Sequence, residues 1–520
     1  MFSMFRKFTL LSFFLILLCI EGYAQEKHVC GTSPEALQQI QQRLIANKEI
    51  LRLKGRVAHQ RSQEDVFIPL KFHLIANDIG RNRVSTSDVF DQMCTLNETF
   101  KDLNLQFYIK DFNILNSGRI FDNPTRLTVE GEMDEIRDLN AINIFVVKEA
   151  QNPNSERPGM TLGYYDARTV AGPDGFTRDW IVIEREQVRD GGMTLPHELG
   201  HFFSLPHPFN GWDQVSYDPN VHGSPVQDDS PRGIPNEFAD GSNCETAGDF
   251  ICDTPADYLT SINNNTCRYS IPLIDPHGDT LNPDPTLIMG YFLDNCMNRF
   301  TPMQTELMIA DYNTQRRSYL RGEDIGLVKG VDITDEPIVL VAPDNGSTVS
   351  ITDEVRFEWQ TVEGAQYYAI EVFSFSNSIA FLKTSNTSIS IPLEVGREYR
   401  WRVRPYNDTY FCAPNSELRA FTTDLASSVP QIQAVESWAI QPNPLIKDRH
   451  LSLSLSAKES FEASIRITNL AGQVVHLVQN IPFQTGTNQQ LIDTDNLLAG
   501  VYIVALENKE GVVHQKLVIQ

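Results

Sequence analysis

Beyond its N-terminus the chain has no long apolar run. The one such run, residues 8–20, follows Arg6 and Lys7 and precedes the small-residue stretch at 22–24. This order is typical of a cleaved signal peptide, and the run is short for a helix that spans a membrane. We therefore predict a signal peptide at 1–24, export of the chain, and no membrane span in the rest of the chain.

Basic residues are scarce relative to acidic ones. The chain has 43 Lys and Arg residues against 67 Asp and Glu residues, which gives a formal net charge of −24 at pH 7. Because nucleic acids and anionic membranes attract positive surfaces, this charge argues against either as a partner. The chain of 520 residues is also too long for one compact core, so about two to four domains are expected.

Cysteine is scarce as well, with eight residues in the chain, of which Cys19 lies in the predicted signal peptide. Cys30, Cys94 and Cys412 are scattered, and Cys94 adjoins an apolar helical stripe where a buried, inert thiol is expected. The other four lie in one part of the chain: Cys244, Cys252, Cys267 and Cys296. In an exported protein such a group predicts two disulfides, for which three connectivities are possible.

Against this background one stretch stands out, His197-Glu198-Leu199-Gly200-His201, followed by His207. On a helix His197 and His201 project from one face, one turn apart, which suits a Zn²⁺ ion. Glu198 lies beside that ion, where it can accept a proton from water. If the chain turns back after the helix, His207 completes a set of three ligands and leaves the fourth position open, as in catalytic sites. The alternative is a helix whose histidines are merely packed or exposed.

Pro196 limits where this helix begins, because proline cannot lie deep inside a helix. The helix is therefore expected to start just before it, after the break at Gly191 and Gly192, with Asp190 or Thr194 as the cap.

These residues resemble the metzincin zinc proteases, and their flanks resemble the pappalysin group, over roughly residues 30–320. The resemblance implies a secreted zinc endopeptidase that cleaves proteins or peptides. One position departs from the pattern: metzincins have glycine where this chain has Ser204. Glycine there supports a positive φ, and serine would carry a strain cost of about 1 kcal/mol.

Residues 25–65 are polar and helix-prone, with too few apolar residues for a core, and are interpreted as a pro-segment. They contain Cys30-Gly31-Thr32, which resembles the Cys-Gly-Thr of pappalysin-like zymogens. A thiolate is a strong zinc ligand, so Cys30 could occupy the open position and keep the enzyme latent. A spare thiol near the terminus is the equally weighted alternative.

Residues 66–325 are expected to form the catalytic domain, an α+β fold with a mixed sheet, the zinc helix and a loop-rich lower subdomain. The segment 159–164 is expected at the sheet edge above the cleft, where substrates commonly add as an extra strand. After His207 the sequence lacks periodicity, which predicts loops held by disulfides, with disorder as the alternative. The other predicted strands are 68–75, 106–109, 142–147 and 180–183, with helices at 89–103 and 302–319.

In the lower subdomain the family resemblance favours the pairs Cys244–Cys267 and Cys252–Cys296. The stretch 248–255 contains Asp253-Thr254-Pro255, which resembles a pappalysin signature. Its carboxylates could bind Ca²⁺, which prefers oxygen ligands. Acidic loops that are simply solvated are the alternative.

The segment 287–291 resembles the metzincin Met-turn, in which a methionine, here Met289, packs beneath the zinc histidines. By the same resemblance Tyr291 would stabilise the tetrahedral intermediate, with a buried core tyrosine as the alternative. Asp294 corresponds to an acidic residue that in pappalysin relatives pairs with Arg or Lys just after the cut. Charge-assisted hydrogen bonds would then favour cleavage on the amino side of these residues. A solvated loop acid is the alternative.

Two all-β sandwich modules are expected after the catalytic domain. Residues 337–424 show alternating strands around 355–359 and 399–403 and resemble a fibronectin type III module, a spacer or a binding unit. Residues 437–520 resemble the C-terminal sorting domain of type IX secretion. This resemblance implies that the type IX secretion machinery is a partner and that the chain passes through the periplasm to the cell surface or medium. The predicted strands of this domain are 451–455, 463–469, 501–507 and 512–519.

The sequence thus predicts a secreted zinc metalloendopeptidase in which Glu198 is the general base and Tyr291 stabilises the oxyanion. An inactive zinc-binding scaffold is the first rival, and the retained Glu198 argues against it because a structural site needs no base. A surface adhesin with a vestigial protease domain is the second rival.

Overall fold

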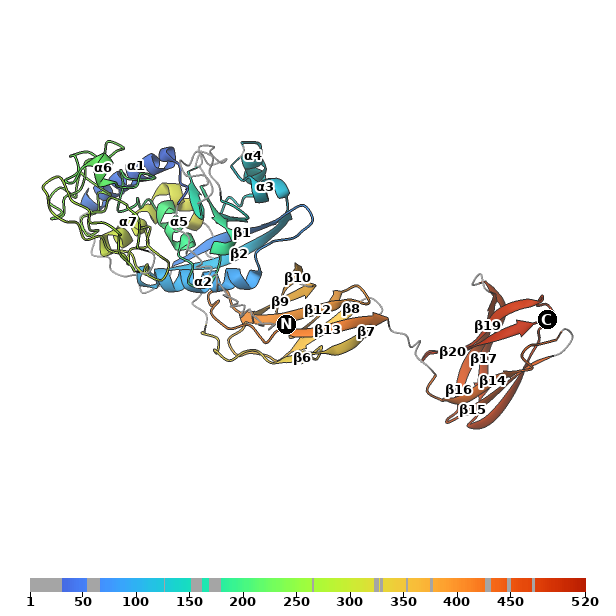
Figure 1. The fold of residues 1–520 in the computed structure, drawn as a ribbon. Helices are drawn as coiled ribbons and strands as arrows, with labels where there is room; N and C mark the ends of the chain where they lie inside the picture. Colours follow the sequence, from blue (N-terminus) through green and yellow to red (C-terminus); the bar gives the residue numbers. More distant parts are fainter. Residues whose placement is uncertain are drawn as a thin grey trace, which may run out of the picture. The chain divides into compact units, whose positions relative to one another are not determined.

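The structure is a computed structural model, drawn as a ribbon in Figure 1. The chain falls into two compact units. The first unit comprises Met1–Ala342, Glu358–Ile389 and Arg400–Arg419, and the second comprises Pro343–Phe357, Ser390–Tyr399 and Ala420–Gln520. The predicted signal peptide lies outside the described residues. The structure describes residues 30–53, 66–125, 127–150, 161–167, 179–263, 266–321, 327, 331–351, 354–374, 377–425, 432–446, 450–469 and 473–520.

The first unit is built on a mixed five-stranded sheet with the strand order β2-β1-β3-β5-β4. The edge strand β4 is antiparallel to β5, and the other pairs are parallel. Parallel strands covered on both faces are apolar along their length, and every residue of β3 is buried. The strands are β1 (Val66–Ala76), β2 (Leu105–Asn116), β3 (Ile142–Val147), β4 (Gly163–Asp166) and β5 (Trp180–Glu184).

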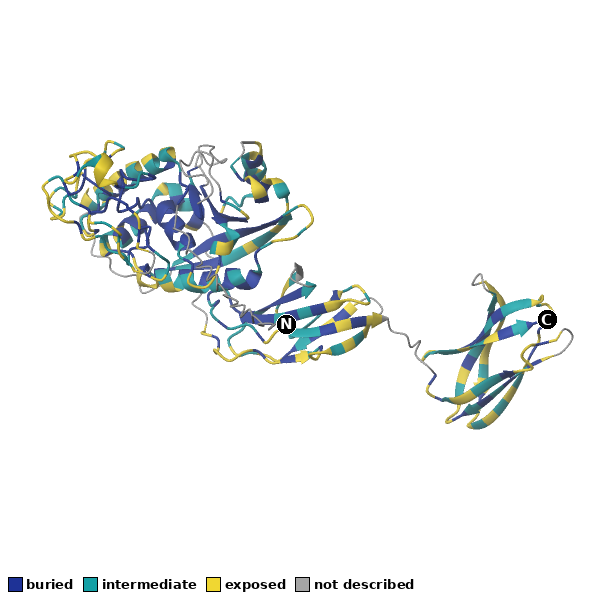
Figure 2. Cartoon of the chain, in the orientation of Figure 1, coloured by how far each residue is buried: buried dark blue, intermediate teal, exposed yellow. Residues whose placement is uncertain are grey.

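Helices cover both faces of this sheet. On one face α2 (Thr86–Phe100) buries Val89 and Met93 in the same cluster as Ile144 of β3. On the other face α3 (Gly118–Asp122) and α4 (Leu127–Ile136) pack against Phe145 and Trp180. The dark blue of the buried residues in Figure 2 is concentrated in this sheet and in α5 (Thr194–Phe202) behind it. The first unit also holds α1 (Pro34–Leu53), η1 (Lys101–Leu103), η2 (Arg185–Gln187), α6 (Pro219–His222), α7 (Pro302–Tyr312) and η3 (Gln315–Arg321).

Turns and loops dominate the chain after α5. Of the described residues between Phe202 and Pro302, only Pro219–His222 are helical. Their order comes from a small aromatic cluster that includes Phe209, Trp212 and Tyr258, and from disulfides. The predicted loop-rich lower subdomain is confirmed.

The disulfide pairing differs from the expected one. Cys244 pairs with Cys252, eight residues on, and Cys267 pairs with Cys296. The pairs Cys244–Cys267 and Cys252–Cys296 are therefore wrong, because the turns between residues 244 and 252 fold back on themselves and bring the nearer partner into reach. Cys94 is not a free thiol either: it is bonded to Cys412, 318 residues away.

A buried ionic network ties α1 to the rest of the first unit. Asp179 has a side chain that is fully buried and forms ion pairs with Arg43 of α1, Arg316 and Arg317. Burial raises the pKa of Asp179, but the three guanidinium groups outweigh it and bring the pKa to about 2. Arg317, itself fully buried, also donates to Asp311 and to the carbonyl of Phe202, the last residue of α5.

The remaining strands form all-β structure, and with the mixed sheet and its helices this confirms the predicted fold class. No helix among the described residues is both long and apolar enough to cross a membrane. Outside the first sheet the strands are β6 (Leu340–Ala342), β7 (Ser347–Ile351), β8 (Glu354–Trp359), β9 (Tyr367–Ser374), β10 (Asn377–Thr384), β11 (Ser388–Pro392), β12 (Glu398–Tyr406), β13 (Arg419–Leu425), β14 (Val435–Gln441), β15 (Leu451–Ala457), β16 (Phe461–Asn469), β17 (Val474–Phe483), β18 (Gly486–Ile492), β19 (Gly500–Glu507) and β20 (Val512–Ile519).

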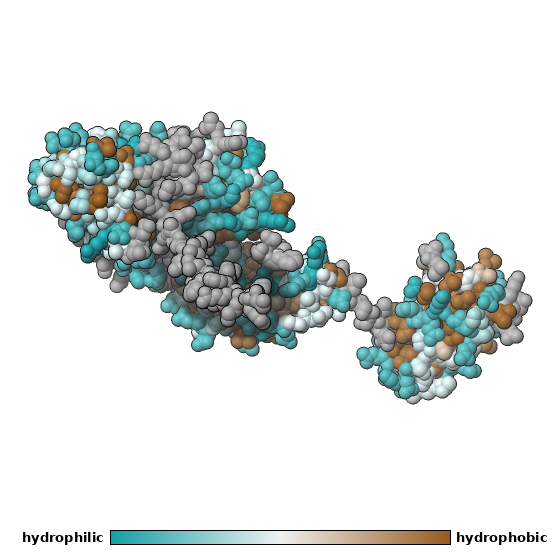
Figure 3. All heavy atoms as spheres, viewed as in Figure 1, coloured by the Kyte–Doolittle hydropathy of each residue, from teal (hydrophilic) through white to brown (hydrophobic). Residues whose placement is uncertain are grey.

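The C-terminal part of the second unit has two sheets, β14-β15-β18 and β17-β16-β19-β20, around one apolar core. Its alternating sequence buries one face of each strand, as in β15, where every second residue is buried. Several large apolar side chains stay exposed on this part, and brown atoms mark its surface in Figure 3. They include Val474, Leu477, Leu491 and Leu498.

His73 on β1 predicts a pH dependence of stability. The ring is fully buried between Asn143 and Asn113, and burial lowers its pKa from 6.5 to about 4. The unfolded chain therefore binds more protons between pH 6.5 and 4, so this contribution to stability is present above pH 6.5 and is lost as the pH falls towards 4. The loss amounts to about 3 kcal/mol.

Thermal unfolding measured between pH 7 and 4.5 checks this prediction. His73→Gln should flatten the pH dependence of the melting temperature, whereas the same change at the exposed His450 should leave it unaltered. Equal slopes for the wild-type protein and His73→Gln would contradict it.

Candidate active site

The helix α5 carries the first two histidines and begins where proline allows. It starts at Thr194, so Pro196 lies in its first turn, as expected. The cap differs from both candidates: Met193 is the N-cap residue and makes no side-chain cap hydrogen bond, while Asp190 lies in the preceding turn. The next two elements of the motif, Ser204 and His207, follow directly after the helix ends at Phe202.

Three imidazole nitrogens converge at one point. Nε2 of His207 lies 3.2 Å from Nε2 of His197 and 3.0 Å from Nε2 of His201. All three rings are buried. These are the residues that the sequence pattern selects, and the turn after α5 is what brings His207 back.

The opposite side of each ring fixes which nitrogen carries the proton. Nδ1 of His197 faces the carbonyl oxygen of Ile288 at 2.8 Å, and Nδ1 of His201 faces that of Leu205 at 2.7 Å. A carbonyl oxygen only accepts, so each Nδ1 carries the hydrogen and each Nε2 presents a lone pair. Nδ1 of His207 lies 2.5 Å from Asp213.

A cation fits this arrangement. Lone pairs that face one another across about 3 Å repel, and a cation between them removes this repulsion. A tetrahedral ion bound at about 2.0–2.1 Å by imidazole would hold the three nitrogens about 3.3 Å apart. Together with Sγ of Cys30, the nitrogens form a group of four ligand atoms that all lie within 4.8 Å of one another.

Cys30 and Glu198 lie together against this cluster. Sγ of Cys30 is 3.5 Å from Oε2 of Glu198 and 3.0 Å from Oγ1 of Thr32, and Cys30 is a free thiol. Burial and then the Glu198 carboxylate raise the pKa of the thiol well above its usual value. Burial also raises the pKa of Glu198 to about 8. Oε1 of Glu198 is buried without a hydrogen-bond partner.

The segment around Cys30 lies along the edge strand of the sheet. Cys30 pairs with Gly163 of β4 in a parallel bridge, and the amide of Gly31 donates to the carbonyl of Gly163 at 2.8 Å. Oγ1 of Thr32 accepts a hydrogen bond from the amide of Tyr165. Part of the predicted edge segment, residues 159–160, lies outside the described residues. The backbone edge of β4 next to the histidines is therefore occupied by the chain itself.

Met289 lies directly below α5. A Cβ on Gly200 would come within 2.2 Å of its sulfur, so only glycine fits there while Met289 stays in place. The turn that carries Met289 also supplies the Ile288 carbonyl that holds His197. Sequence reasoning found Met289 but missed this carbonyl, because a backbone group has no signature in the sequence.

Tyr291 points its hydroxyl at the same place. The hydroxyl accepts from the amide of Cys30 at 3.1 Å and lies 3.3 Å from the carbonyl of Cys30. Its ring lies 4.9 Å from the ring of His207, between centroids. Burial, more than the neighbouring charges, raises the pKa of Tyr291 well above its usual value, so the hydroxyl keeps its proton.

Ser204 adopts the expected positive φ, at 69°. Its hydroxyl accepts a hydrogen bond from the side-chain amide of Asn47 on α1, at 2.9 Å. The departure from glycine at this position thus creates a contact between α1 and the turn that leads to His207.

Asp294 is not a free acid. Its carboxylate lies 2.5 Å from the guanidinium of Arg189, and the Asp294 side chain is 13% exposed against 48% for Arg189. Arg189 precedes α5 and was not among the residues selected from the sequence, because nothing in its local pattern distinguishes it from other surface arginines.

The acidic stretch 248–255 has two kinds of carboxylate. Asp253 accepts from the hydroxyl of Thr301 and the amide of Met303, and so caps α7. Asp249 is fully buried and lies near Glu237, whose Oε2 has no hydrogen-bond partner. Burial and then Asp249 raise the pKa of Glu237 to about 9. Glu237 lies outside the signature stretch, so its sequence position gave no signal.

Comparison with known proteins places this geometry in context. Residues 439–520 match the secretion system C-terminal sorting domain family. An extracellular metalloprotease of Colletotrichum graminicola is 25% identical over 267 residues, which cover 48% of this chain and 78% of that protein. An extracellular metalloprotease of Neurospora crassa is 23% identical over 303 residues, covering 55% and 88%.

Among solved structures, a promirolysin mutant of Tannerella forsythia aligns with 56% of this chain and 97% of its own length, at 20% identity and a TM-score of 0.35. The sequence relatives and the buried histidine cluster agree with the predicted activity and with export. The chain is an extracellular metalloendopeptidase that ends in a secretion system C-terminal sorting domain.

Proposed function

We propose that the chain is the latent precursor of a zinc endopeptidase in which His197, His201 and His207 hold the metal and Cys30 masks it. The convergence of the three Nε2 atoms within 3.2 Å carries this proposal. Three nitrogens and a thiol are a donor set that suits Zn²⁺. When bound, zinc acts as a Lewis acid that polarises a carbonyl and acidifies water.

The chain's own residues supply the rest of the chemistry. Asp213 lies on the far side of His207, whereas Glu198 lies beside Cys30 at the histidine cluster. Oε1 of Glu198 has no hydrogen-bond partner and can hold the proton taken from water and pass it to the leaving amine. The hydroxyl of Tyr291 already binds backbone of the pro-segment. After that segment leaves, the protonated hydroxyl is free to donate to a substrate oxygen on which negative charge develops.

Latency follows from what the pro-segment occupies. Cys30 fills the position beside Glu198, and its backbone takes the β4 edge and the Tyr291 hydroxyl. A substrate that adds as a strand to β4 needs the same edge. The helix α1 adds a second attachment through Arg43 to Asp179 and Asn47 to Ser204, so release breaks buried polar contacts as well as the thiol contact.

If the chain were instead an inactive zinc-binding scaffold, the histidine cluster would hold a purely structural metal. A structural site has no use for an unpartnered buried carboxylate beside the metal position, whereas a hydrolytic site does. Glu198 therefore favours the enzyme.

We also propose that Asp294 selects a cationic residue just after the cut, in competition with Arg189. A largely buried carboxylate prefers a guanidinium, and in the precursor the chain's own Arg189 provides one. Substrate arginine or lysine would replace it or share the carboxylate.

Ca²⁺ is proposed as a second, structural ion, held by Glu237 and Asp249. Both carboxylates are buried, and Lys48, whose charge acts on Asp249, forms its ion pair with Glu245 instead. Buried carboxylates that lack an ion pair are costly unless they are neutral or bind a metal. Ca²⁺ prefers oxygen ligands of this kind.

Glu198→Ala should keep the fold and one equivalent of zinc but lower kcat by a factor of about 10²–10⁴, because the ligands stay and the base is lost. Metal analysis and a peptide assay on the processed protein measure both. Zinc-loaded Glu198→Ala with activity within tenfold of the wild type would remove Glu198 from the mechanism.

Cys30→Ala should shorten the lag before the precursor becomes active, because water then reaches the fourth metal position. The time course of peptide cleavage by purified precursor measures this lag. Glu35→Gln, an exposed change on the same segment, is the control. If latency is unchanged in Cys30→Ala, the thiol has no masking role.

Asp294→Asn should reduce the ratio of kcat/KM for substrates with Arg after the cut to those with Leu by roughly tenfold to a hundredfold. Arg189→Gln should increase the same ratio, because the carboxylate loses its internal competitor. Glu306→Gln, on the exposed surface, should do neither. Cleavage of a peptide library dominated by apolar residues after the cut would refute the pocket assignment.

Calcium should raise the melting temperature of the first unit, by an amount equivalent to about 2.7 kcal/mol at a concentration one hundred times its Kd. Glu237→Gln should abolish this rise, and the exposed Asp240→Asn should keep it. The comparison is made on zinc-loaded protein by calorimetry with and without added calcium. An equal rise in both variants would exclude Glu237 as a ligand.

A further inference from the structure

Within the first unit, the strands β9 and β12 and the loop after β12 are fastened to the catalytic part at α2. Glu371 of β9 is buried and accepts from both the amide and the hydroxyl of Thr86, at 3.0 and 2.7 Å. Arg404 of β12, also buried, donates to Asp91 at 2.7 Å and to the carbonyl of Ser87 at 3.2 Å. The Glu371 carboxylate complements the positive N-terminal end of the α2 dipole. The Arg404 guanidinium complements the Asp91 carboxylate.

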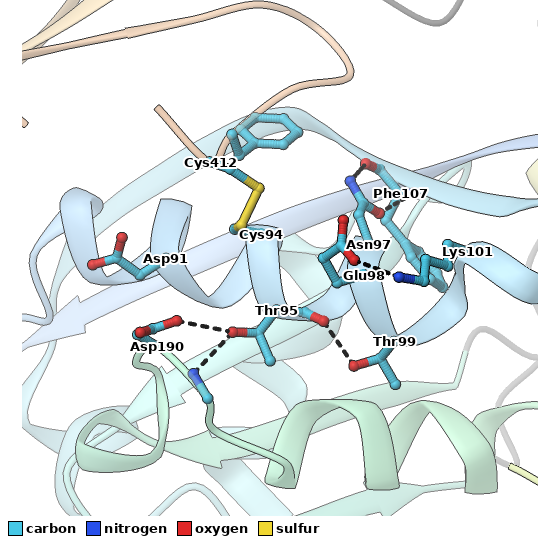
Figure 4. The surroundings of a disulfide bond; sticks show 12 residues. Asp91, Cys94, Thr95, Asn97, Glu98, Thr99, Lys101, Phe107, Asp190 and Cys412 are labelled. Carbon is cyan, nitrogen blue, oxygen red and sulfur yellow. Dashed lines mark hydrogen bonds and ion pairs between the residues drawn. A yellow bond between two sulfur atoms is a disulfide. The ribbon is translucent and has the colours of Figure 1, made fainter. Parts of the chain in front are cut away.

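Apolar and covalent contacts reinforce these bonds. The ring of Phe90 lies 4.7 Å from that of Tyr406 and 5.8 Å from that of Phe411, between centroids. The disulfide Cys94–Cys412 joins the same helix to the loop after β12 (Figure 4). From Thr86 to Cys94, α2 is therefore held along more than two turns by residues of β9, β12 and the loop that follows.

The next positions on α2 hold the loop that precedes the active-site helix, here called the 188–193 loop. The fully buried Gln92 donates to the carbonyl of Gly192 at 3.0 Å and accepts from the amide of Arg189. The hydroxyl of Thr95 accepts from the amide of Gly191 at 2.9 Å and lies 3.5 Å from Asp190, as Figure 4 shows. Gln92 directly follows Asp91, which pairs with Arg404 of β12. Thr95 directly follows Cys94, which is bonded to Cys412 in the loop after β12.

This loop carries two groups of the site. Its last residue, Met193, caps α5 and accepts the amide hydrogen of His197 at 3.0 Å. Arg189 pairs with Asp294. A shift of α2 by one ångström would therefore be passed to the start of α5 and to that ion pair, and displacements of this size in an active site can cost about a hundredfold in rate.

We propose that the residues 358–389 and 400–419 are a positioning element of the catalytic unit, which acts through Gln92 and Thr95 of α2 on the 188–193 loop. This inference rests on the endopeptidase activity and on the specificity role proposed for Asp294. Gln92 and Thr95 are positioning residues, since neither touches the histidine cluster in the contacts described.

The test compares full-length variants on both sides of α2. The double variant Cys94→Ala/Cys412→Ala and the single variant Glu371→Gln loosen the attachment, and Gln92→Ala cuts the link to the loop. Exposed Glu98→Gln on α2, whose carboxylate pairs with Lys101, is the matched control. Measured are zinc content, amide hydrogen exchange of residues 188–193, and the ratio of kcat/KM for Arg against Leu after the cut.

All three variants are expected to bind zinc as the wild type does, to exchange the 188–193 amides at least tenfold faster, and to change the Arg-to-Leu ratio at least threefold. Combining the disulfide variant with Gln92→Ala should change the ratio by less than the product of the separate effects, because both act along one route. Gln92→Asn, which keeps the amide group on a shorter stem, should recover part of the exchange protection.

The proposal would be overturned if the three variants lower the melting temperature but leave the exchange of the 188–193 amides and the Arg-to-Leu ratio of kcat/KM unchanged. The attachment would then be purely structural. Multiplicative effects of the disulfide variant and Gln92→Ala would overturn the proposal too. If the wild-type protein cleaves no peptide at all, the proposed function fails, but the exchange of the 188–193 amides still decides whether the attachment positions the loop. Glu371→Gln keeps the disulfide, so the test survives if the double variant does not fold.

Discussion

Mutual repulsion among three imidazole nitrogens is the constraint on which the site depends. Nε2 of His207 lies 3.0 and 3.2 Å from its two neighbours, with lone pairs turned inward. The helix α5 places His197 and His201 on one face, but His207 lies beyond its end and is brought in by the following turn. The convergence is held from outside, by the carbonyls of Ile288 and Leu205 and by Asp213, each on the far side of one ring. The surrounding fold positions those three acceptors. A cation at the centre would be bound by the three lone pairs that otherwise repel one another.

Burial of the histidine cluster also bears on the proposed latency. In a dry site a carboxylate is costly, which is why the pKa of Glu198 rises to about 8 while Cys30 lies against it. Cys30 lies against the β4 edge, the Tyr291 hydroxyl and the three histidines, the groups that a substrate would use under the proposed function. In that proposal, inhibition by the chain itself and binding of substrate rely on one set of groups.

Local sequence predicted what local physics determines. The strands Ile142–Val147 and Val512–Ile519 have the predicted bounds, because continuous apolar runs and clean alternation each select one backbone geometry. The two short helices α3 and α4 were missed, since segments of this length carry too few turns for a periodic signal. The helix predicted at 302–319 breaks after Tyr312 and continues as a 3-10 helix from Gln315.

What the sequence could not reveal are the pairings between distant residues. His197, Glu198, His201 and His207 could be selected because the motif fixes their spacing, and Met289 because its segment resembles the Met-turn. All five meet in the structure. The Cys94–Cys412 bond spans 318 residues, and the Arg189–Asp294 pair spans 105, so neither leaves a local trace. The prediction of the disulfides in the lower subdomain was wrong for the opposite reason. The partner of Cys244 is only eight residues away, whereas the family resemblance favoured a longer loop.

Among the described residues, two kinds of buried carboxylate can be compared: those held by ion pairs and those with an oxygen that lacks a hydrogen bond. Asp179 is matched by three arginines, and Glu371 is held by Arg402 and by the start of α2. Such pairs join segments far apart in sequence and need no further partner. Glu198 and Glu237 are equally buried, yet one oxygen of each has no hydrogen bond. Removing a charge from water without compensation is expensive, so a fold keeps such a group only where a ligand, a proton or a metal completes it. By this one physical criterion, the two glutamates support both the proposed catalytic position and the proposed calcium position.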